Sequence, residues 1–107
     1  MPWSPALAER VESALARLGV HGARQKHVFS GRGFLLGKRA AVIVWGDALL
    51  VKVPAAEYAA ALATPGVTPF APDGARPMTT WVVVAEEVIA DDPELAAWVA
   101  RGVASVR

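Results

Sequence analysis

The sequence contains no cysteine and only two histidines among its 107 residues. Without cysteine, the chain has no disulfides, no thiolate nucleophiles and no thiolate metal ligands. His21 and His27 lack the His-x-His or His-x-x-x-His spacing of paired metal ligands, so the pattern argues against a metal site. We therefore expect neither a metal nor a cofactor, and the absence of cysteine fits a reducing compartment such as the cytoplasm.

Long apolar runs are also missing. No run approaches the roughly 18 residues of a membrane-spanning helix, although 54% of the residues are hydrophobic, which is enough for one core. The first residues do not show the basic segment followed by an apolar segment that marks a secretory signal. We expect one soluble cytoplasmic domain covering residues 1–107, with no membrane partner.

The net charge of +1 is too small to indicate a polyanionic partner, but the charges are unevenly distributed. Residues 21–40 contain no acid and carry Arg24, Lys26, Arg32, Lys38 and Arg39. Residues 86–94 contain no base and carry Glu86, Glu87, Asp91, Asp92 and Glu94. The two segments can pair with each other or across a self-association interface, or can form two separate solvated faces.

Three segments combine helical spacing of apolar residues with helix start and stop signals. They cover residues 4–19, 54–64 and 92–106. In the first segment, Ser4 is placed to cap the helix and Pro5 suits the first helical position. In the third, Asp92 is the expected cap. The apolar stripe of that helix consists of Leu95, Trp98, Val99 and Val103.

Short runs of β-branched and aromatic residues predict the strands. They cover residues 26–29, 33–36, 40–45, 48–53 and 78–85. The first four runs are separated by glycine-containing turns, which indicates a meander of three or four antiparallel strands. The continuous valines of the last run suggest burial on both faces. Residues 65–77, rich in proline and glycine, are expected to form an irregular loop with Phe70 turned inward. The order helix, strands, helix, loop, strand, helix indicates an α+β fold with a mainly antiparallel sheet.

The glycines of residues 26–39 raise the question of a phosphate-binding loop. Gly31, Gly33 and Gly37 do not match the dinucleotide fingerprint, because Leu36 occupies the position of the third glycine and a strand follows. A P-loop requires a hydroxyl side chain where Arg39 stands. We interpret these glycines as turn residues that tolerate a positive φ.

Catalytic patterns are absent as well, and no nucleophile-elbow motif surrounds Ser30. We identify no catalytic residue and expect a protein that is not an enzyme. Basic residues interleaved with Phe29 and Phe34 resemble the ingredients of a nucleic-acid surface, although strand alternation places both phenylalanines in the core. The four tryptophans are expected to be core or interface anchors rather than a ligand cage; they are Trp3, Trp45, Trp81 and Trp98.

The order of motifs resembles the N-terminal domain of the TfoX (Sxy-like) family of bacterial proteins. The similar segments are residues 28–53, 57–70, 74–84 and 94–103. Family members have Met-Phe-Gly-Gly at residues 28–31 and Gly-Arg-Pro-Met-x-Gly-Trp-Val at residues 75–82. The residues that carry the resemblance are Phe29, Gly31, Phe34, Arg76, Pro77, Met78 and Trp81. Val28, Ser30, Ala75 and Thr80 depart from the family pattern.

The resemblance implies a secretion-chaperone-like α+β fold, a class whose members often dimerise. Named family members regulate natural competence together with a transcription activator and carry a second, C-terminal domain, whereas this chain spans the first domain. The leading hypothesis is a non-enzymatic regulatory or protein-interaction module with a protein partner in transcription regulation. We expect a homodimer with Trp45 or Trp98 in its interface. The alternative is a nucleic-acid-binding domain that uses the basic hairpin of residues 24–39.

Overall fold

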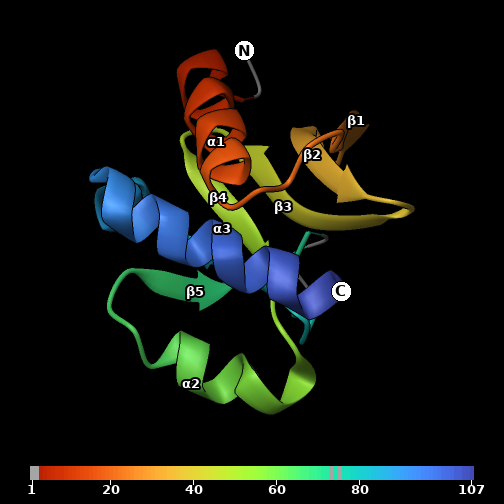
Figure 1. The fold of residues 1–107 in the computed structure, drawn as a ribbon. Helices are drawn as coiled ribbons and strands as arrows, with labels where there is room; N and C mark the ends of the chain where they lie inside the picture. Colours follow the sequence, from red (N-terminus) through yellow and green to blue (C-terminus); the bar gives the residue numbers. More distant parts are fainter. Residues whose placement is uncertain (1–2, 73, 75) are drawn as a thin grey trace.

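The computed structural model describes residues 3–72, 74 and 76–107 and shows three α-helices flanking a six-stranded antiparallel sheet (Figure 1). The expected α+β class is confirmed. The strands are β1 Arg24–Val28, β2 Gly31–Leu36, β3 Arg39–Trp45, β4 Ala48–Lys52, β5 Val67–Pro69 and β6 Trp81–Val84. The α-helices are α1 Pro5–Arg17, α2 Tyr58–Leu62 and α3 Asp92–Val106, and 3₁₀ turns cover Ala55–Glu57 and Glu86–Ile89. The strand order is β1-β2-β3-β4-β6-β5.

Helix α1 begins as the sequence predicts. The Ser4 Oγ accepts a hydrogen bond from the backbone N–H of Leu7 at 3.1 Å, and Pro5 occupies the first turn. This cap satisfies one of the N–H groups that a helix start leaves unpaired. The Ser4 N–H also donates to the carbonyl oxygen of Gly46 at 2.9 Å, which ties the start of α1 to the β3–β4 turn.

The start of α3 differs from the expectation by one residue. Asp91, not Asp92, is the residue before the helix, and its side chain makes no capping hydrogen bond. The Asp92 carboxylate instead accepts from the Arg10 guanidinium, at 3.2 Å from Nε and 3.0 Å from Nη2. Arg10 also donates to the carbonyl oxygens of Ile89 and Ala90. A charged partner on α1 therefore holds the side chain that was predicted to be the cap.

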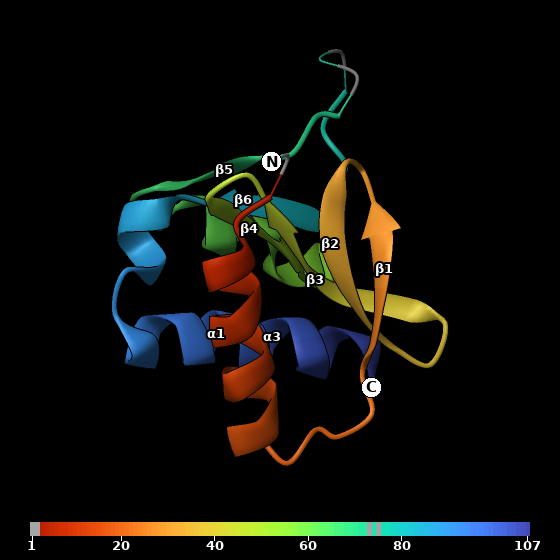
Figure 2. The ribbon, with the colours of Figure 1, turned by 90° about the horizontal axis from the view of Figure 1, so that it is seen from above.

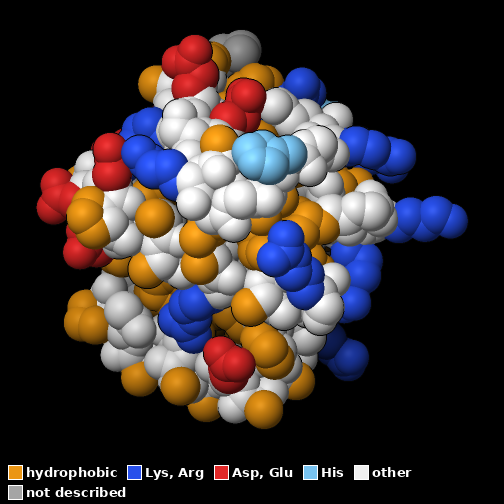
Figure 3. Space-filling view, viewed as in Figure 1, with side chains coloured by type: hydrophobic (Ala, Val, Ile, Leu, Met, Phe, Trp, Pro, Cys, Tyr) orange, Lys and Arg blue, Asp and Glu red, His pale blue; other side chains and the backbone are white. Residues whose placement is uncertain are grey.

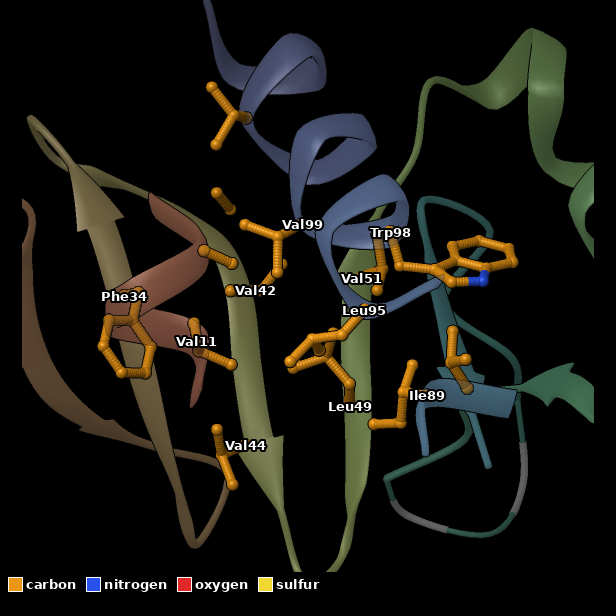
Figure 4. Close-up of a cluster of buried hydrophobic side chains, with 14 of the residues drawn as sticks. Val11, Phe34, Val42, Val44, Leu49, Val51, Ile89, Leu95, Trp98 and Val99 are labelled. Atoms are coloured by element: carbon orange, nitrogen blue, oxygen red, sulfur yellow. The ribbon is translucent and has the colours of Figure 1, made fainter. Parts of the chain in front are cut away.

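Helices α1 and α3 cover one face of the sheet, which we call the inner face (Figures 1 and 2). The predicted apolar stripe of α3 is buried there together with strand residues of β3 and β4 (Figure 4). Gly102 lets α3 approach the sheet closely, because a Cβ at this position would collide with the Ala41 carbonyl oxygen and lie 2.8 Å from Val42 Cγ1. The main core thus lies between the two long helices and the centre of the sheet.

The prediction that the glycines of residues 26–39 are turn residues is only partly confirmed. Gly37 has a φ of +64° in the β2–β3 turn, as predicted. The β1–β2 turn contains no glycine, and its two residues, Phe29 and Ser30, have φ values of 51° and 67°. Two successive residues with positive φ form the turn type whose twist suits a two-residue hairpin. Side chains other than glycine, asparagine and aspartate are strained in this region.

The turn interpretation is wrong for Gly31 and Gly33, which lie inside strand β2 without a positive φ. They are required for space instead. A Cβ at Gly31 would collide with the carbonyl oxygen of Val44, and one at Gly33 would lie 2.8 Å from Val28 Cγ2. Both glycines therefore allow neighbouring strands and the Val28 side chain to pack closely against β2.

Two further elements differ from the sequence expectation. Residues 65–77 are not wholly irregular, because Val67–Pro69 pairs with β6 as an edge strand. Proline, which lacks an N–H, is tolerated at such an edge. The second helix is shorter than predicted: Ala55–Glu57 forms a 3₁₀ turn before α2.

Candidate functional site

The face of the sheet opposite α1 and α3, which we call the outer face, carries a second and smaller apolar cluster. Its buried members are Ile43, Leu50, Phe70 and Trp81. The connection between β5 and β6 runs on this side of the sheet, away from the helices (Figure 2). The Met78 N–H donates to the Phe70 carbonyl oxygen at 2.8 Å, which holds the two arms of this connection together. Phe70 and Met78 of this connection therefore pack against the outer face, whereas two helices cover the inner face.

Three aromatic rings meet at one end of the outer face, and we call them the aromatic cluster: Phe29, Trp45 and Phe70. The Phe70 ring is buried and lies edge-on to both others, 5.3 Å from the Phe29 centroid and 5.4 Å from that of Trp45. Phe29 and Trp45 are 41% and 37% exposed. Among the described residues the only other exposed large apolar side chain is Leu18, which lies elsewhere, at the end of α1. Edge-to-face contacts hold the two exposed rings in place.

The structure brings together several of the residues that carry the family resemblance. Phe29 contacts Phe70, and Met78 and Trp81 belong to the same apolar cluster. Trp81 is buried at the start of β6, as expected of a core anchor, whereas Met78, which was predicted to begin this strand, is half-buried and precedes it. Arg76 and Pro77 are exposed in the β5–β6 connection. Residues about 50 positions apart in the sequence thus converge on one face.

Phe34 and Phe29 do not share an environment, although strand alternation assigned both to the core. Phe34 is buried on the inner face against the helices (Figure 4), as predicted. The prediction for Phe29 is wrong, because this residue lies in the turn beyond the last strand pair, Val28 with Gly31. The alternation of side chains between two faces applies only within the strand.

Lys52 and Trp81 lie opposite each other on β4 and β6. The Lys52 ammonium lies 5.3 Å from the centroid of the Trp81 ring and donates to Thr80 Oγ1 at 3.1 Å. Burial lowers the pKa of Lys52 below its ordinary value, and the positive charge of Arg39 adds to this effect. The outer face thus holds one partly desolvated cation beside its apolar cluster.

The predicted basic residues are spread over strands β1, β2 and β3 and the β2–β3 turn. Figure 3 shows Lys and Arg side chains along its right-hand edge. Arg24 and Lys26 are exposed on β1, and Lys38 and Arg39 are exposed at the β2–β3 turn. Arg32 is engaged: its Nε donates to Gln25 Oε1 at 2.9 Å, and its guanidinium lies 5.5 Å from the centroid of the Trp3 ring.

The acidic segment does not pair with these bases within the described part of the chain. The ion pairs found there join Arg10 to Asp92 at 3.0 Å and Arg101 to Glu57 at 3.8 Å. Figure 3 shows the acidic side chains gathered mainly at the upper left, on the side opposite the basic edge. Within the described residues, the two charged segments therefore do not neutralise each other.

The described residues form no group of three or more histidine or acidic side chains that would hold a metal ion. His21 and His27 are both exposed. Within the same residues, no helix has the length and apolar character required to cross a membrane. The surface feature that stands out is therefore the aromatic cluster rather than a constellation of ionisable groups.

Sequence reasoning missed that Phe29, Trp45 and Phe70 meet. A partial signal was present, because Phe29 and Trp45 border the first and third turns of the predicted meander. Alternate turns of an antiparallel meander lie at the same end of the sheet. The position of Phe70 against both rings depends on the path of the β5–β6 connection, which no local pattern specifies.

These observations define a small α+β domain with a cluster of three aromatic rings, two of them exposed, at one end of the outer face of its sheet. Residues 14–106 match the TfoX N-terminal domain, and the chain belongs to this family. Neither the curated proteins nor the solved structures yield a significant match. The expected likeness to the secretion-chaperone fold therefore stays a prediction.

Proposed function

We propose that the chain is a non-enzymatic regulatory module of the cytoplasm that acts by binding proteins through its aromatic cluster. The observation that carries this proposal is that Phe29 and Trp45, two of the three exposed large apolar side chains among the described residues, contact the same buried ring of Phe70. Exposed aromatic residues that are already held in position are typical anchors of protein interfaces. Membership of the TfoX N-terminal domain family agrees with a regulatory role and a partner in transcription regulation.

The first partner in this proposal is a second copy of the chain. Trp98 is only 7% exposed and packs in the main core, so Trp45 is the tryptophan that remains for an interface. The basic and acidic segments lie on different sides of the domain and are not paired with each other. A two-fold interface uses the same surface patch of both copies, so the aromatic cluster, and not the pair of charged segments, is the surface proposed to be shared.

Light scattering tests this assignment. The parent is expected at about twice its chain mass of 11.2 kDa. The double variant Phe29→Ala/Trp45→Ala is expected near 11.2 kDa with an unchanged circular dichroism spectrum. Leu18→Ala is the matched control, because Leu18 is 40% exposed but lies outside the cluster, and it should remain dimeric. A monomeric parent, or a double variant that still dimerises, would contradict the proposed interface.

The same variants test the regulatory part of the proposal. Tagged parent, Phe29→Ala/Trp45→Ala and Leu18→Ala chains are crosslinked in their native cell and recovered. A transcription-related protein recovered with the parent and with Leu18→Ala, but lost with the double variant, supports the role. Equal recovery with all three chains would show that the cluster does not bind it.

A nucleic-acid-binding role is the second candidate, and one observation favours it. The exposed basic residues Arg24 and Lys26 lie on edge strand β1, which leads directly to the exposed ring of Phe29. Cations beside an aromatic ring are the combination that binds single strands. Fluorescence anisotropy with a labelled single-stranded oligonucleotide should then show salt-dependent binding that Arg24→Glu/Lys26→Glu abolishes. Binding unaffected by this variant would assign the nucleic acid to another surface.

A further inference from the structure

A shallow, open hollow of about 480 Å³ lies beside the aromatic cluster. The β3–β4 turn contributes Trp45, Asp47 and Ala48, and the end of β6 and its continuation contribute Val83, Ala85 and Glu86. The space exists because small side chains stand next to a large one. Ala48, Val83 and Ala85 are half-buried and line the hollow together with the exposed Trp45. The floor of the hollow is therefore apolar and one wall is aromatic.

Two carboxylates border this apolar floor. Asp47 and Glu86 are exposed, and neither has a hydrogen bond or an ion pair among the described residues. Arg10 lines a neighbouring hollow that the same two carboxylates also border. Its guanidinium is already bound to Asp92 at 3.0 Å and to two carbonyl oxygens. The chain itself therefore leaves the negative charge at the rim uncompensated.

We propose that this hollow binds a segment of a partner protein that presents an arginine or lysine next to an apolar side chain. The apolar side chain and the aliphatic part of the basic residue pack on Ala48, Val83 and the Trp45 ring. The cationic end reaches the carboxylates of Asp47 and Glu86. An acidic segment or a nucleic-acid backbone would be repelled by the same carboxylates. This inference rests on the proposed protein-binding function and names the chemistry of a partner.

The test uses the indole N–H signal of Trp45, which NMR resolves once Trp45→Phe has identified it. Three short peptides serve as probes: one repeats Arg-Leu, one repeats Glu-Leu and one repeats Arg-Ser. The Arg-Leu peptide is expected to shift the Trp45 signal in a saturable way, in competition with a second copy of the chain, because the proposed dimer also uses Trp45. The other two peptides should bind more weakly or not at all. Asp47→Asn/Glu86→Gln should weaken binding of the Arg-Leu peptide about tenfold, as expected for the loss of two exposed charges.

The matched control is Asp91→Asn/Glu94→Gln, which also removes two carboxylate charges but lies outside the hollow, and it should leave binding unchanged. Equal binding of the Glu-Leu peptide, or an equal loss of binding in both double variants, would overturn the proposal.

Light scattering of the same variants distinguishes a partner protein from a second copy of the chain. If Asp47→Asn/Glu86→Gln lowers the mass of the parent dimer while the Arg-Leu peptide does not bind, a second copy occupies the hollow and the proposal is wrong. A monomeric parent that still binds the Arg-Leu peptide would overturn self-association and support the hollow.

Discussion

The two faces of the sheet are built differently. On the inner face, α1 and α3 bury Val42, Val44, Leu49 and Val51 completely, and α3 approaches so closely that only glycine fits at position 102. The outer face buries only four residues, one of which, Phe70, belongs to the β5–β6 connection, and it leaves two aromatic rings exposed at one end. A face covered by regular elements can be packed without gaps, whereas a face covered by a connection retains apolar surface. The inner face therefore supplies stability, and the outer face offers a surface to partners.

The largest expected effect comes from two neighbouring residues that test this difference directly. Leu49 and Leu50 are both fully buried in β4 but face the inner and outer sides respectively. Truncation of a buried leucine to alanine typically costs about 2–5 kcal/mol. The cost of Leu49→Ala should lie at the upper end of this range, because the packed helices cannot close the cavity. The cost of Leu50→Ala should lie at the lower end, because the β5–β6 connection can move toward the sheet and reduce the cavity. Urea unfolding measures both values, and an equal or larger cost for Leu50→Ala would contradict the comparison.

Substitutions that add side-chain volume should also destabilise the inner face more than the outer face. Gly102→Val forces a side chain against Ala41 and Val42, and overpacking of this kind costs about 1–3 kcal/mol. Ala48→Leu places a larger side chain into the open hollow and should leave the free energy of unfolding nearly unchanged. Thermal and urea unfolding of the two variants provide the measurement. A Gly102→Val chain as stable as the parent would show that α3 can move away from the sheet.

The β1–β2 turn, next to the aromatic cluster, should gain stability from a single substitution. Ser30 has a φ of 67°, where a side chain is strained and glycine is not. Ser30→Gly, which restores the family residue, is expected to raise the free energy of unfolding by about 0.5–1 kcal/mol. For a domain of this size, the melting temperature then rises by about 3–6 °C. Ser30→Ala is the control and should not stabilise the chain. An unchanged melting temperature for Ser30→Gly would show that the turn is not strained.

The smallest expected effect concerns Lys52, the partly desolvated cation of the outer face. Its pKa is lowered in the folded chain, while the unfolded chain keeps the ordinary value of 10.5. Between these two pKa values the unfolded state binds more protons, so stability rises as the pH approaches 10.5. The parent should therefore gain stability with rising pH relative to Lys52→Met, as measured by urea unfolding across that range. The same pH dependence in both chains would show that Lys52 is as well solvated as a free lysine.

Much of the fold could be predicted because its signals are local. The cap at Ser4, the first-turn proline Pro5 and the apolar stripe of α3 follow from neighbouring residues along the chain. The predictions that failed depend on distant partners. Gly31 and Gly33 were assigned to turns, whereas the contacts that require them come from other strands. Val67–Pro69 was assigned to a loop, although pairing with β6 makes it a strand.

The aromatic cluster shows most clearly the difference between features that depend on neighbouring residues and features that depend on distant ones. Composition and spacing alone established an α+β domain without thiol or paired-histidine chemistry, and they supplied the aromatic residues. Only the tertiary structure decided that Phe29 is exposed rather than buried and that Trp45 meets it across the ring of Phe70. Hydrophobic periodicity specifies which face of a strand a residue occupies. It does not specify which turns come together or how a long connection crosses the sheet, because those depend on contacts between residues far apart in the chain.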